Sequence, residues 1–231
     1  MRVIIAPDAE AAAHGAAGEL ARACAAAVAE RGRAVIALSG GRSPLRAFEL
    51  FARAPLPWAS MVVAQVDERC VPAQDARRNL APLQRLLVEQ GELPRDNLLG
   101  MPVERGDLER AADDYAAQLR ERLGPDGEFD IVQLGLGDDG HTASLVPGDP
   151  VLDVDERDVA VTARPYQGTR RMTLTYRRLQ SARERLWFVT GAGKAATLAE
   201  LIEGTGSSPA VRVRREDTVV VTDRAASPLS R

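Results

Sequence analysis

Chemically versatile side chains gather in one glycine-rich loop, Gly135–Ser144, which directly follows an apolar run. In this loop His141 comes shortly after two acids, Asp138 and Asp139. An imidazole titrates near neutral pH, so it can take a proton from water and later deliver it to a leaving alcohol. Asp139, or another nearby acid, could hold the second ring nitrogen and stabilise the imidazolium. We therefore interpret His141 as a general base; the alternative is a histidine that only caps the turn.

Other catalytic patterns fit these residues less well. The loop has the Gly-x-Gly-x-x-Gly spacing of a dinucleotide site, but Asp138 and Asp139 would place negative charge beside the pyrophosphate, and Pro147 stops any following helix after about two turns. His14, the second histidine, lies in an Ala-rich run without polar company. The chain has no Gly-x-Ser-x-Gly elbow and no His-Glu-x-x-His zinc motif. Direct activation of water by His141, without a metal, is the simplest mechanism.

A second candidate loop lies between an apolar run and a predicted helix. It reads Ser39-Gly40-Gly41-Arg42-Ser43 and is followed by Pro44. Paired glycines let backbone N–H groups turn toward an anion, and a helix N-terminus adds a partial positive charge. Arg42 and the two hydroxyls could add direct contacts. The alternative is an ordinary tight turn, in which Ser43 caps a helix with Pro44 in its first position.

Further cations follow or precede other apolar runs. Asp67-Glu68-Arg69 comes after the next run, and this group can bind hydroxyls and a phosphate together, because arginine presents a planar fork to oxygen acids. Its alternative is a salt-bridged surface turn. Arg170-Arg171 precedes a predicted strand, and Lys194, the only lysine, opens a predicted helix. Each of these could reach a phosphate or could be a solvated surface charge.

The apolar runs alternate with helical patterns along the chain. We predict strands over Arg2–Ala6, Ala34–Leu38, Met61–Val66, Phe129–Leu134, Val159–Ala163, Met172–Thr175, Leu186–Thr190 and Thr218–Thr222. We predict helices over Ala9–Glu30, Pro44–Ala52, Asn79–Gln90, Asp107–Leu123 and Lys194–Ile202. This alternation predicts an α/β fold, with a largely parallel sheet covered on both faces and residues 1–231 in a single domain. Ligands of such sheets bind beyond the carboxyl ends of the strands, so Ser39–Ser43, Asp67–Val71 and Gly135–Ser144 should share one edge.

Composition excludes several other classes of protein. The 231 residues carry a formal net charge of -3, which gives no reason to expect nucleic-acid or membrane binding. No run approaches the ~20 apolar residues of a membrane span, and an early acid and proline disfavour a signal peptide. Cys24 and Cys70 form neither a disulfide framework nor a metal pattern. We expect a cytoplasmic protein.

The same loops, taken in order, resemble the 6-phosphogluconolactonase family. The family pattern has Ser-Gly-Gly after a strand, then Asp-Glu-Arg-x-Val-Pro, then Gly-x-Gly-x-Asp-Gly-His-Thr-Ala-Ser-Leu. Here these pieces are Ser39–Gly41, Asp67–Pro72 and Gly135–Leu145. Further similarities lie at Asn79, Arg171–Thr175, Gly193–Ala195 and Asp223–Ala226, so the resemblance covers nearly the whole chain. One departure is that Arg42 and Ser43 stand where the family usually has Ser-Thr.

The resemblance implies a Rossmann-like, mostly parallel sheet and hydrolysis of 6-phospho-D-glucono-1,5-lactone to 6-phosphogluconate, without a cofactor. It implies that His141 activates water, while Asp67 and Asp139 orient sugar hydroxyls or the histidine. Contacts to the phosphate and the oxyanion would come from Arg69, Arg171 and Lys194, and the sugar site would be lined by Ser39, Gly40 and Gly41. The expected partner is a small phosphosugar lactone, bound by a monomer or a small homo-oligomer.

Two other functions stay open at this point. A glucosamine-6-phosphate deaminase or isomerase shares this fold, but it needs a carboxylate to abstract a carbon-bound proton and an acid after the loop histidine. Thr142–Leu145 follows His141 here, with no acid before Asp149, which favours hydrolysis. The second alternative is a catalytically idle sugar-phosphate sensor. Regulatory relatives usually append a DNA-binding module, for which the strand that directly follows Met1 leaves no room.

Overall fold

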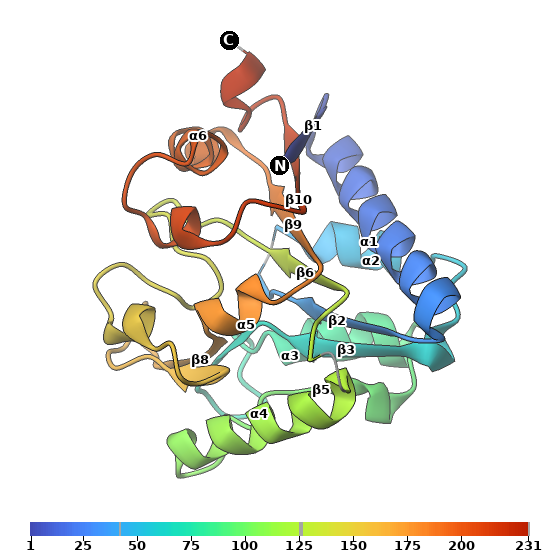
Figure 1. Ribbon diagram of the computed structural model, residues 1–231, viewed down its shortest axis with the longest axis vertical. Coiled ribbons are helices and arrows are strands. Elements are labelled where there is room, and N and C mark those ends of the chain that lie inside the picture. The colour runs from blue at the N-terminus through green and yellow to red at the C-terminus, as the bar shows by residue number, and fades with distance from the viewer. Residues whose placement is uncertain (42, 125–126, 231) are drawn as a thin grey trace.

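A seven-stranded parallel sheet forms the centre of the protein, as shown by a computed structural model that describes residues 1–41, 43–124 and 127–230 (Figure 1). Arg42 lies outside the described residues. The strand order is β1-β10-β9-β6-β2-β3-β5, and all neighbouring pairs run parallel. The strands are β1 (Arg2–Ala6), β2 (Ala34–Leu38), β3 (Met61–Gln65), β5 (Leu98–Leu99), β6 (Ile131–Leu134), β9 (Glu184–Val189) and β10 (Thr218–Asp223).

Helices cover both faces of this sheet, as the alternation of strands and helices predicted. On one face α1 (Ala9–Arg31) and α2 (Leu45–Phe51) pack against strand residues such as Ile36. On the other face α4 (Leu108–Leu123), α5 (Tyr176–Gln180) and α6 (Ala195–Glu203) share a core with strand residues such as Ala37. Successive side chains of a strand point to opposite faces, so the continuous apolar runs supply both cores.

A second, antiparallel sheet lies beside the first one. It consists of β4 (Asp67–Arg69), β8 (Arg171–Leu174) and β7 (Val159–Val161) in that order. The sequence predicted the last two strands as members of one largely parallel sheet and assigned Asp67–Arg69 to a loop. The chain leaves the parallel sheet at Val66, whose N–H donates to Leu38 of β2 and whose carbonyl accepts from Leu174 of β8. This change of partner creates the smaller sheet.

Two predicted helices differ from those observed. The helix predicted over Asn79–Gln90 is α3 (Leu80–Leu83), which continues as π-helical turns over Gln84–Glu89. The helix predicted to begin at Pro44 starts at Leu45, and no side chain caps its N-terminus, so the expected Ser43 cap is wrong. The other predicted helices and strands agree closely with the structure.

The strand order reverses between β2 and β6, which are neighbours in the sheet. From β2 the chain moves outward to β3 and β5, whereas from β6 it moves the other way, to β9 and β10. Loops on either side of such a reversal diverge, and a crevice opens between them at the carboxyl ends of the strands. Ser39–Gly41 follows β2 and Gly135–Ser144 follows β6. The fold therefore places both glycine-rich loops at this crevice.

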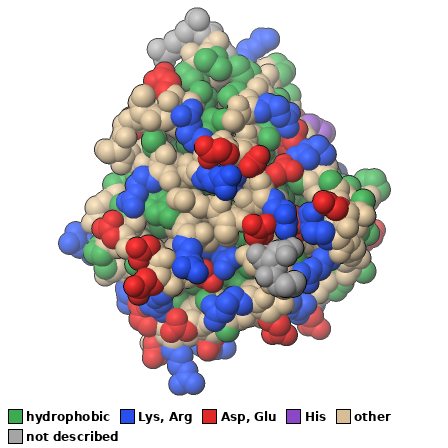
Figure 2. Space-filling model, in the orientation of Figure 1, with side chains coloured by type: hydrophobic (Ala, Val, Ile, Leu, Met, Phe, Trp, Pro, Cys, Tyr) green, Lys and Arg blue, Asp and Glu red, His purple; other side chains and the backbone are tan. Residues whose placement is uncertain are grey.

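In the described part of the chain, none of the helices combines the length and apolar character that crossing a membrane requires. Lys and Arg side chains are interspersed with Asp and Glu side chains over the face shown in Figure 2.

Candidate active site

A cleft of about 160 Å³ opens at the point where the strand order reverses. Its walls come from the loops after β2 and β6, from β4 and β8 of the small sheet, and from the turn that precedes α6. The predicted site residues that line it are Ser39, Gly40, Gly41, Asp67, Arg69, His141, Arg171 and Lys194. The structure thus brings together residues that are far apart in the sequence.

His141 is held against Asp139 at the edge of the cleft. Its Nδ1 atom lies 2.6 Å from Oδ1 of Asp139, and its side chain is 23% exposed. The backbone N–H of His141 donates to the same carboxylate oxygen at 3.1 Å. Burial opposes ionisation of Asp139, but these hydrogen bonds outweigh it and lower the pKa of the carboxyl below its ordinary value. With Nδ1 engaged by Asp139, Nε2 is the ring nitrogen that remains for a molecule in the cleft.

The backbone around His141 requires glycine at Gly137. The N–H of Gly137 donates to the carbonyl of His141 at 2.8 Å, which closes the loop on itself. A Cβ atom at Gly137 would lie 2.0 Å from Nδ1 of His141 and 2.6 Å from Oδ1 of Asp139. The glycine spacing that resembles a dinucleotide motif therefore serves a different purpose here, which is to let the backbone pass close to this pair of side chains.

The second histidine, His14, does not line the cleft. Its side chain is 61% exposed on α1, and its Nε2 lies 3.5 Å from Glu10 one turn earlier. The expectation that it has no polar company was wrong, because a helix brings residues four apart to the same face.

Tyr166 contacts the pair of His141 and Asp139, and the sequence analysis did not select it. It belongs to the turn between β7 and β8, and its hydroxyl donates to Oδ2 of Asp139 at 2.9 Å. Its ring meets the ring of His141 edge to face, with centroids 5.2 Å apart. Tyr166 lies in an irregular segment that carries no catalytic motif, so no pattern in the sequence pointed to it.

Asp67 connects three of the loops that form the cleft. It is almost completely buried, and its Oδ2 accepts a hydrogen bond from Ser144 at 2.7 Å. Its Oδ1 lies 3.4 Å from the hydroxyl of Ser39 and 3.4 Å from Nδ2 of Asn79. The carboxylate therefore ties together the segments after β2, β3 and β6, and it also lines the cleft.

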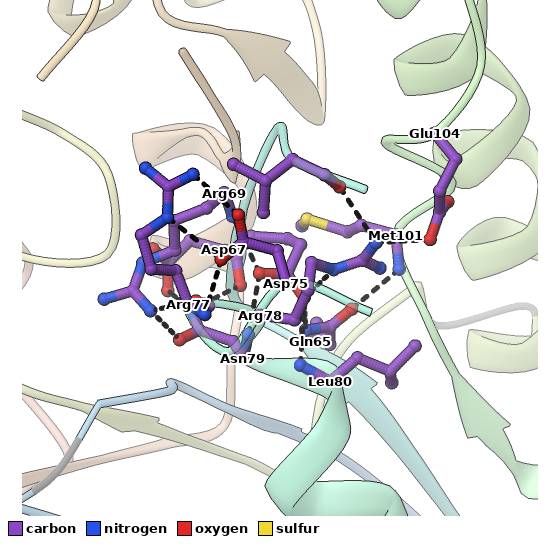
Figure 3. Close-up of polar contacts among 12 residues, drawn as sticks. Gln65, Asp67, Arg69, Asp75, Arg77, Arg78, Asn79, Leu80, Met101 and Glu104 are labelled. Carbon is purple, nitrogen blue, oxygen red and sulfur yellow. Dashed lines mark hydrogen bonds and ion pairs between the residues drawn. The ribbon is translucent and has the colours of Figure 1, made fainter. Parts of the chain in front are cut away.

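Glu68 is fully buried in a polar network, which includes Gln65, Arg78 and Asn79 of Figure 3. It pairs with Arg78 at 3.0 Å and accepts hydrogen bonds from Gln65 and from three backbone N–H groups, those of Arg69, Asn79 and Leu80. Buried charges are found where they are paired and hydrogen-bonded in this way. The alternative of a salt-bridged surface turn is therefore wrong for this segment.

Asn79 connects this buried network to Arg69, which lines the cleft. Its Oδ1 accepts a hydrogen bond from Nη1 of Arg69 at 2.7 Å, and its Nδ2 donates to the carbonyl of Asp67 at 3.0 Å (Figure 3). A Cβ atom at Gly40 would lie only 1.9 Å from Asn79, so this glycine is needed for close approach. The sequence signalled Asn79 only through the family resemblance.

Three cations from the described segments line the cleft together with His141: Arg69, Arg171 and Lys194. Arg171 is 4% exposed, lies opposite Arg69 in the small sheet, and its pKa is lowered because burial disfavours the charged form. Lys194 pairs with Asp138 at 2.5 Å. Arg170 turns elsewhere, since its Nε donates to the carbonyl of Thr162 and its guanidinium lies 3.6 Å from Glu109. Of the predicted pair Arg170-Arg171, the cleft uses Arg171.

Among the described residues, no group of three or more His, Cys, Asp and Glu side chains is arranged to hold a metal ion. The part of the cleft that the described residues line contains one histidine, one carboxylate and three cations, so it is suited to an anionic ligand. A base with a free nitrogen next to cations can activate water and stabilise the negative charge that develops on an oxygen.

Residues 7–222 match the family model described as glucosamine-6-phosphate isomerases/6-phosphogluconolactonase. The chain belongs to this family. Relatives named 6-phosphogluconolactonase include one from a Synechocystis species, which is 37% identical over 179 residues that cover 76% of this chain and 74% of the relative. Another, from Mycobacterium bovis, is 36% identical over 96% of this chain and 95% of its own length.

Solved structures of the family share the fold. A 6-phosphogluconolactonase from Thermotoga maritima superposes with a TM-score of 0.86 at 25% identity, and the alignment covers 96% of this chain and 98% of that one. A monomeric glucosamine-6-phosphate deaminase reaches a TM-score of 0.84 at 21% identity, with all of both chains covered. The second likeness concerns the fold alone, so the two activities must be separated by the chemistry of the site.

Proposed function

We propose that this protein is a 6-phosphogluconolactonase, which hydrolyses 6-phospho-D-glucono-1,5-lactone to 6-phosphogluconate in the oxidative pentose phosphate pathway. The observation that carries the proposal is the pair His141–Asp139 at the edge of a cleft lined by Arg69, Arg171 and Lys194. The relatives named 6-phosphogluconolactonase, which align over most of the chain, support the same activity.

In the proposed mechanism Nε2 of His141 takes a proton from a water molecule as the water oxygen attacks the lactone carbonyl carbon. Asp139 stabilises the imidazolium that forms, and the nearby cations stabilise the negative charge on the former carbonyl oxygen. The bond between this carbon and the ring oxygen then breaks, and His141 returns its proton to the leaving ring oxygen. The products are a free hydroxyl group and a carboxylic acid, which loses its own proton to solvent.

The cations also bind the phosphate of the substrate in this proposal. Arginine binds phosphate with two parallel N–H groups, whereas lysine acts as a point charge. The two arginines come from adjacent strands of the small sheet, and Lys194 comes from the turn that precedes α6. Ser39 and the glycines Gly40 and Gly41 line the remaining part, where the sugar would lie.

The remaining functional expectations are proposed together with this activity. The chain acts as a single domain over residues 1–231, as a monomer or a small homo-oligomer, in the cytoplasm. Its ligand is a small phosphosugar lactone and not a nucleic acid or a membrane. The formal net charge of -3 supports this, as do the intermingled charges on the face shown in Figure 2, because nucleic-acid binding usually requires a continuous basic surface.

The deaminase alternative requires a carboxylate that is free to abstract a proton from carbon. Asp67 is the carboxylate that lines the cleft, and both of its oxygens are within hydrogen-bonding reach of Ser39, Asn79 or Ser144. The residues after His141 include no acid before Asp149, and the hydroxyls of Thr142 and Ser144 donate to Gly135 and Asp67. These contacts favour hydrolysis.

The test compares the wild type with His141→Ala and with His14→Ala, which removes the other, exposed histidine. We expect the wild type to hydrolyse the lactone and His141→Ala to reduce kcat by ~10²–10⁴-fold, the usual effect of losing a general base. His14→Ala should retain the wild-type rate. Spontaneous opening of the lactone must be subtracted. Near wild-type hydrolysis by His141→Ala would contradict the mechanism, and release of ammonia from glucosamine-6-phosphate would overturn the assigned activity.

A further inference from the structure

The connection between β7 and β8 ends in a tight turn that presents Tyr166 to the active site. The backbone of Tyr166 pairs with Thr169 in both directions, and the two residues between them, Gln167 and Gly168, have positive φ values of 51° and 84°. Two consecutive positive φ values are typical of the turn that joins strands of a β-hairpin with the right twist. The turn therefore gives Tyr166 a defined position.

The ring of Tyr166 is held on two sides. The guanidinium of Arg171 lies over it, 4.9 Å from the ring centroid, and the ring of His141 meets it edge to face. Arg171 also contacts the turn itself, with its Nη2 3.3 Å from the side-chain oxygen of Gln167. Cation–π and aromatic contacts of this kind fix the orientation of a tyrosine ring and direct its hydroxyl.

The hydroxyl of Tyr166 lies between Asp139 and His141. It donates to Oδ2 of Asp139 at 2.9 Å, and its oxygen lies 3.3 Å from Nδ1 of His141. Burial, followed by the neighbouring Asp139, raises the pKa of Tyr166 to about 12, so the hydroxyl keeps its proton and remains a donor near neutral pH. Nδ1 of His141 therefore faces two oxygens: Oδ1 of Asp139 and the lone pairs of the tyrosine hydroxyl.

We propose that Tyr166 is a positioning residue that holds Asp139 in place and, together with it, fixes neutral His141 as the tautomer with its proton on Nδ1. The proposal rests on the proposed function only for its effect on rate. A proton on Nδ1 satisfies both oxygens that face this nitrogen, whereas an unprotonated Nδ1 would place a lone pair against them. Nε2 is then unprotonated and can accept the proton of water.

The contribution of Tyr166 is needed because Asp139 is not held firmly by its own surroundings. Its side chain is 38% exposed and stands in a glycine-rich loop, so without the tyrosine Oδ2 would be free to turn toward solvent. The two oxygens of the carboxylate are instead held by different partners, Oδ1 by His141 and Oδ2 by Tyr166. A carboxylate restrained at both oxygens keeps its orientation toward the imidazole.

The chain offers a matched control in Tyr176. Its hydroxyl donates to the carbonyl of Pro209 at 2.8 Å, and the guanidinium of Arg212 lies 4.5 Å from its ring centroid. Tyr176 thus also has a hydrogen-bonded hydroxyl and a cation–π contact, but its partners are Pro209 and Arg212 instead of Asp139, His141 and Arg171. Substitution of either tyrosine by phenylalanine removes one hydroxyl and keeps the ring.

The experiment measures the tautomer of His141 by ¹⁵N NMR of the imidazole nitrogens, in the free protein at a pH where the ring is neutral. His14, which is exposed, provides an internal reference, and His14→Ala assigns the two sets of signals. We expect the wild type and Tyr176→Phe to show His141 with its proton on Nδ1. Tyr166→Phe should transfer part of the population to the Nε2–H form, and Asp139→Asn should do so further.

The kinetic arm of the experiment uses the lactone. We expect Tyr166→Phe to reduce kcat by about 2- to 10-fold with KM unchanged, as loss of one hydrogen bond that acts through the base would do. Tyr176→Phe should keep the wild-type kcat. A Tyr166→Phe protein with the wild-type tautomer would overturn the proposal whatever its rate. If the wild type fails to hydrolyse the lactone, the proposed function is wrong, and the NMR result still decides the role of Tyr166.

Discussion

Oδ1 of Asp139 contacts two nitrogen atoms of His141: it accepts a hydrogen bond from the backbone N–H at 3.1 Å, and it lies 2.6 Å from Nδ1 of the ring. Both nitrogen atoms belong to a residue only two positions later, so the loop itself forms the pair. Burial of Asp139 works against its charge, but the bonds from His141 outweigh this effect and its pKa lies below the ordinary value of 3.8. Asp139 is therefore an ionised partner of the base throughout the range in which an imidazole titrates.

The first prediction concerns the pH dependence of kcat. Since the pKa of Asp139 is lowered, its carboxylate is ionised above pH 3.8 and becomes protonated only at lower pH. Asp139 should then take up no proton as activity is lost in acid, so log kcat should fall with a slope no steeper than one at pH values above 3.8. Initial rates at saturating substrate over this range provide the measurement. A slope of two would show that Asp139 takes up a proton together with the base.

The same lowered pKa has a consequence for stability. A carboxyl whose pKa is lower in the folded protein than in the unfolded chain stabilises the fold at pH values above its unfolded pKa. This contribution of Asp139 is lost as the pH falls through the folded value. Acid unfolding and protonation of Asp139 are therefore linked, and the rate measurements should be limited to the range in which the protein stays folded.

The second prediction separates two neighbouring arginines. Arg171→Gln removes a buried cation from the cleft, whereas Arg170→Gln removes one whose side chain is 39% exposed and lies beside Glu109. We expect Arg171→Gln to raise KM for the lactone about 10- to 100-fold, because charge-assisted hydrogen bonds to the phosphate are lost. Arg170→Gln should leave KM close to the wild-type value. Equal effects of the two substitutions would contradict the placement of the phosphate in this cleft.

The third prediction concerns how much the buried polar network around Glu68 and Arg78 stabilises the fold. Glu68 and Glu104 both pair with Arg78, but Glu68 is fully buried while the side chain of Glu104 is 42% exposed. Glu68→Ala removes the buried partner of Arg78 and leaves the backbone N–H groups of Arg69, Asn79 and Leu80 without this acceptor, which should lower the free energy of unfolding by about 3–5 kcal/mol. Glu104→Ala should lower it by less than about 1 kcal/mol. Urea unfolding of the two variants tests this, and similar losses of stability would refute the assignment.

Much of the site could be predicted because each of its main loops directly follows a buried apolar strand. Ser39–Gly41 and His141 follow strands that lie next to each other at the reversal of strand order, and this adjacency of parallel strand ends is a general property of α/β sheets. Glycines such as Gly137 also mark the loops in which the backbone must approach a side chain closely. Residue type and order along the chain were sufficient for these predictions.

The small antiparallel sheet could not be predicted in the same way. The segment Asp67–Arg69 is polar and short, and it becomes β4 only because Arg171–Leu174, about a hundred residues later, pairs with it. That pairing places Arg69 opposite Arg171 and separates Arg171 from Arg170. The residues of a short polar segment do not identify the strand that will pair with it. The pairing with that strand decides which of its alternating side chains lie on each face of the sheet.

The amino-acid sequence alone determined that this is an α/β protein, and it predicted a histidine base in a glycine-rich loop and several cations available for an anionic ligand. These properties depend on residue type, periodicity and the ends of strands, which are local. Only the tertiary structure showed that Tyr166 reaches Asp139, that Asn79 holds Arg69, and that Glu68 is buried with Arg78. Each of these contacts joins different segments, and their distances depend on how the two sheets pack and not on the spacing of residues along the chain.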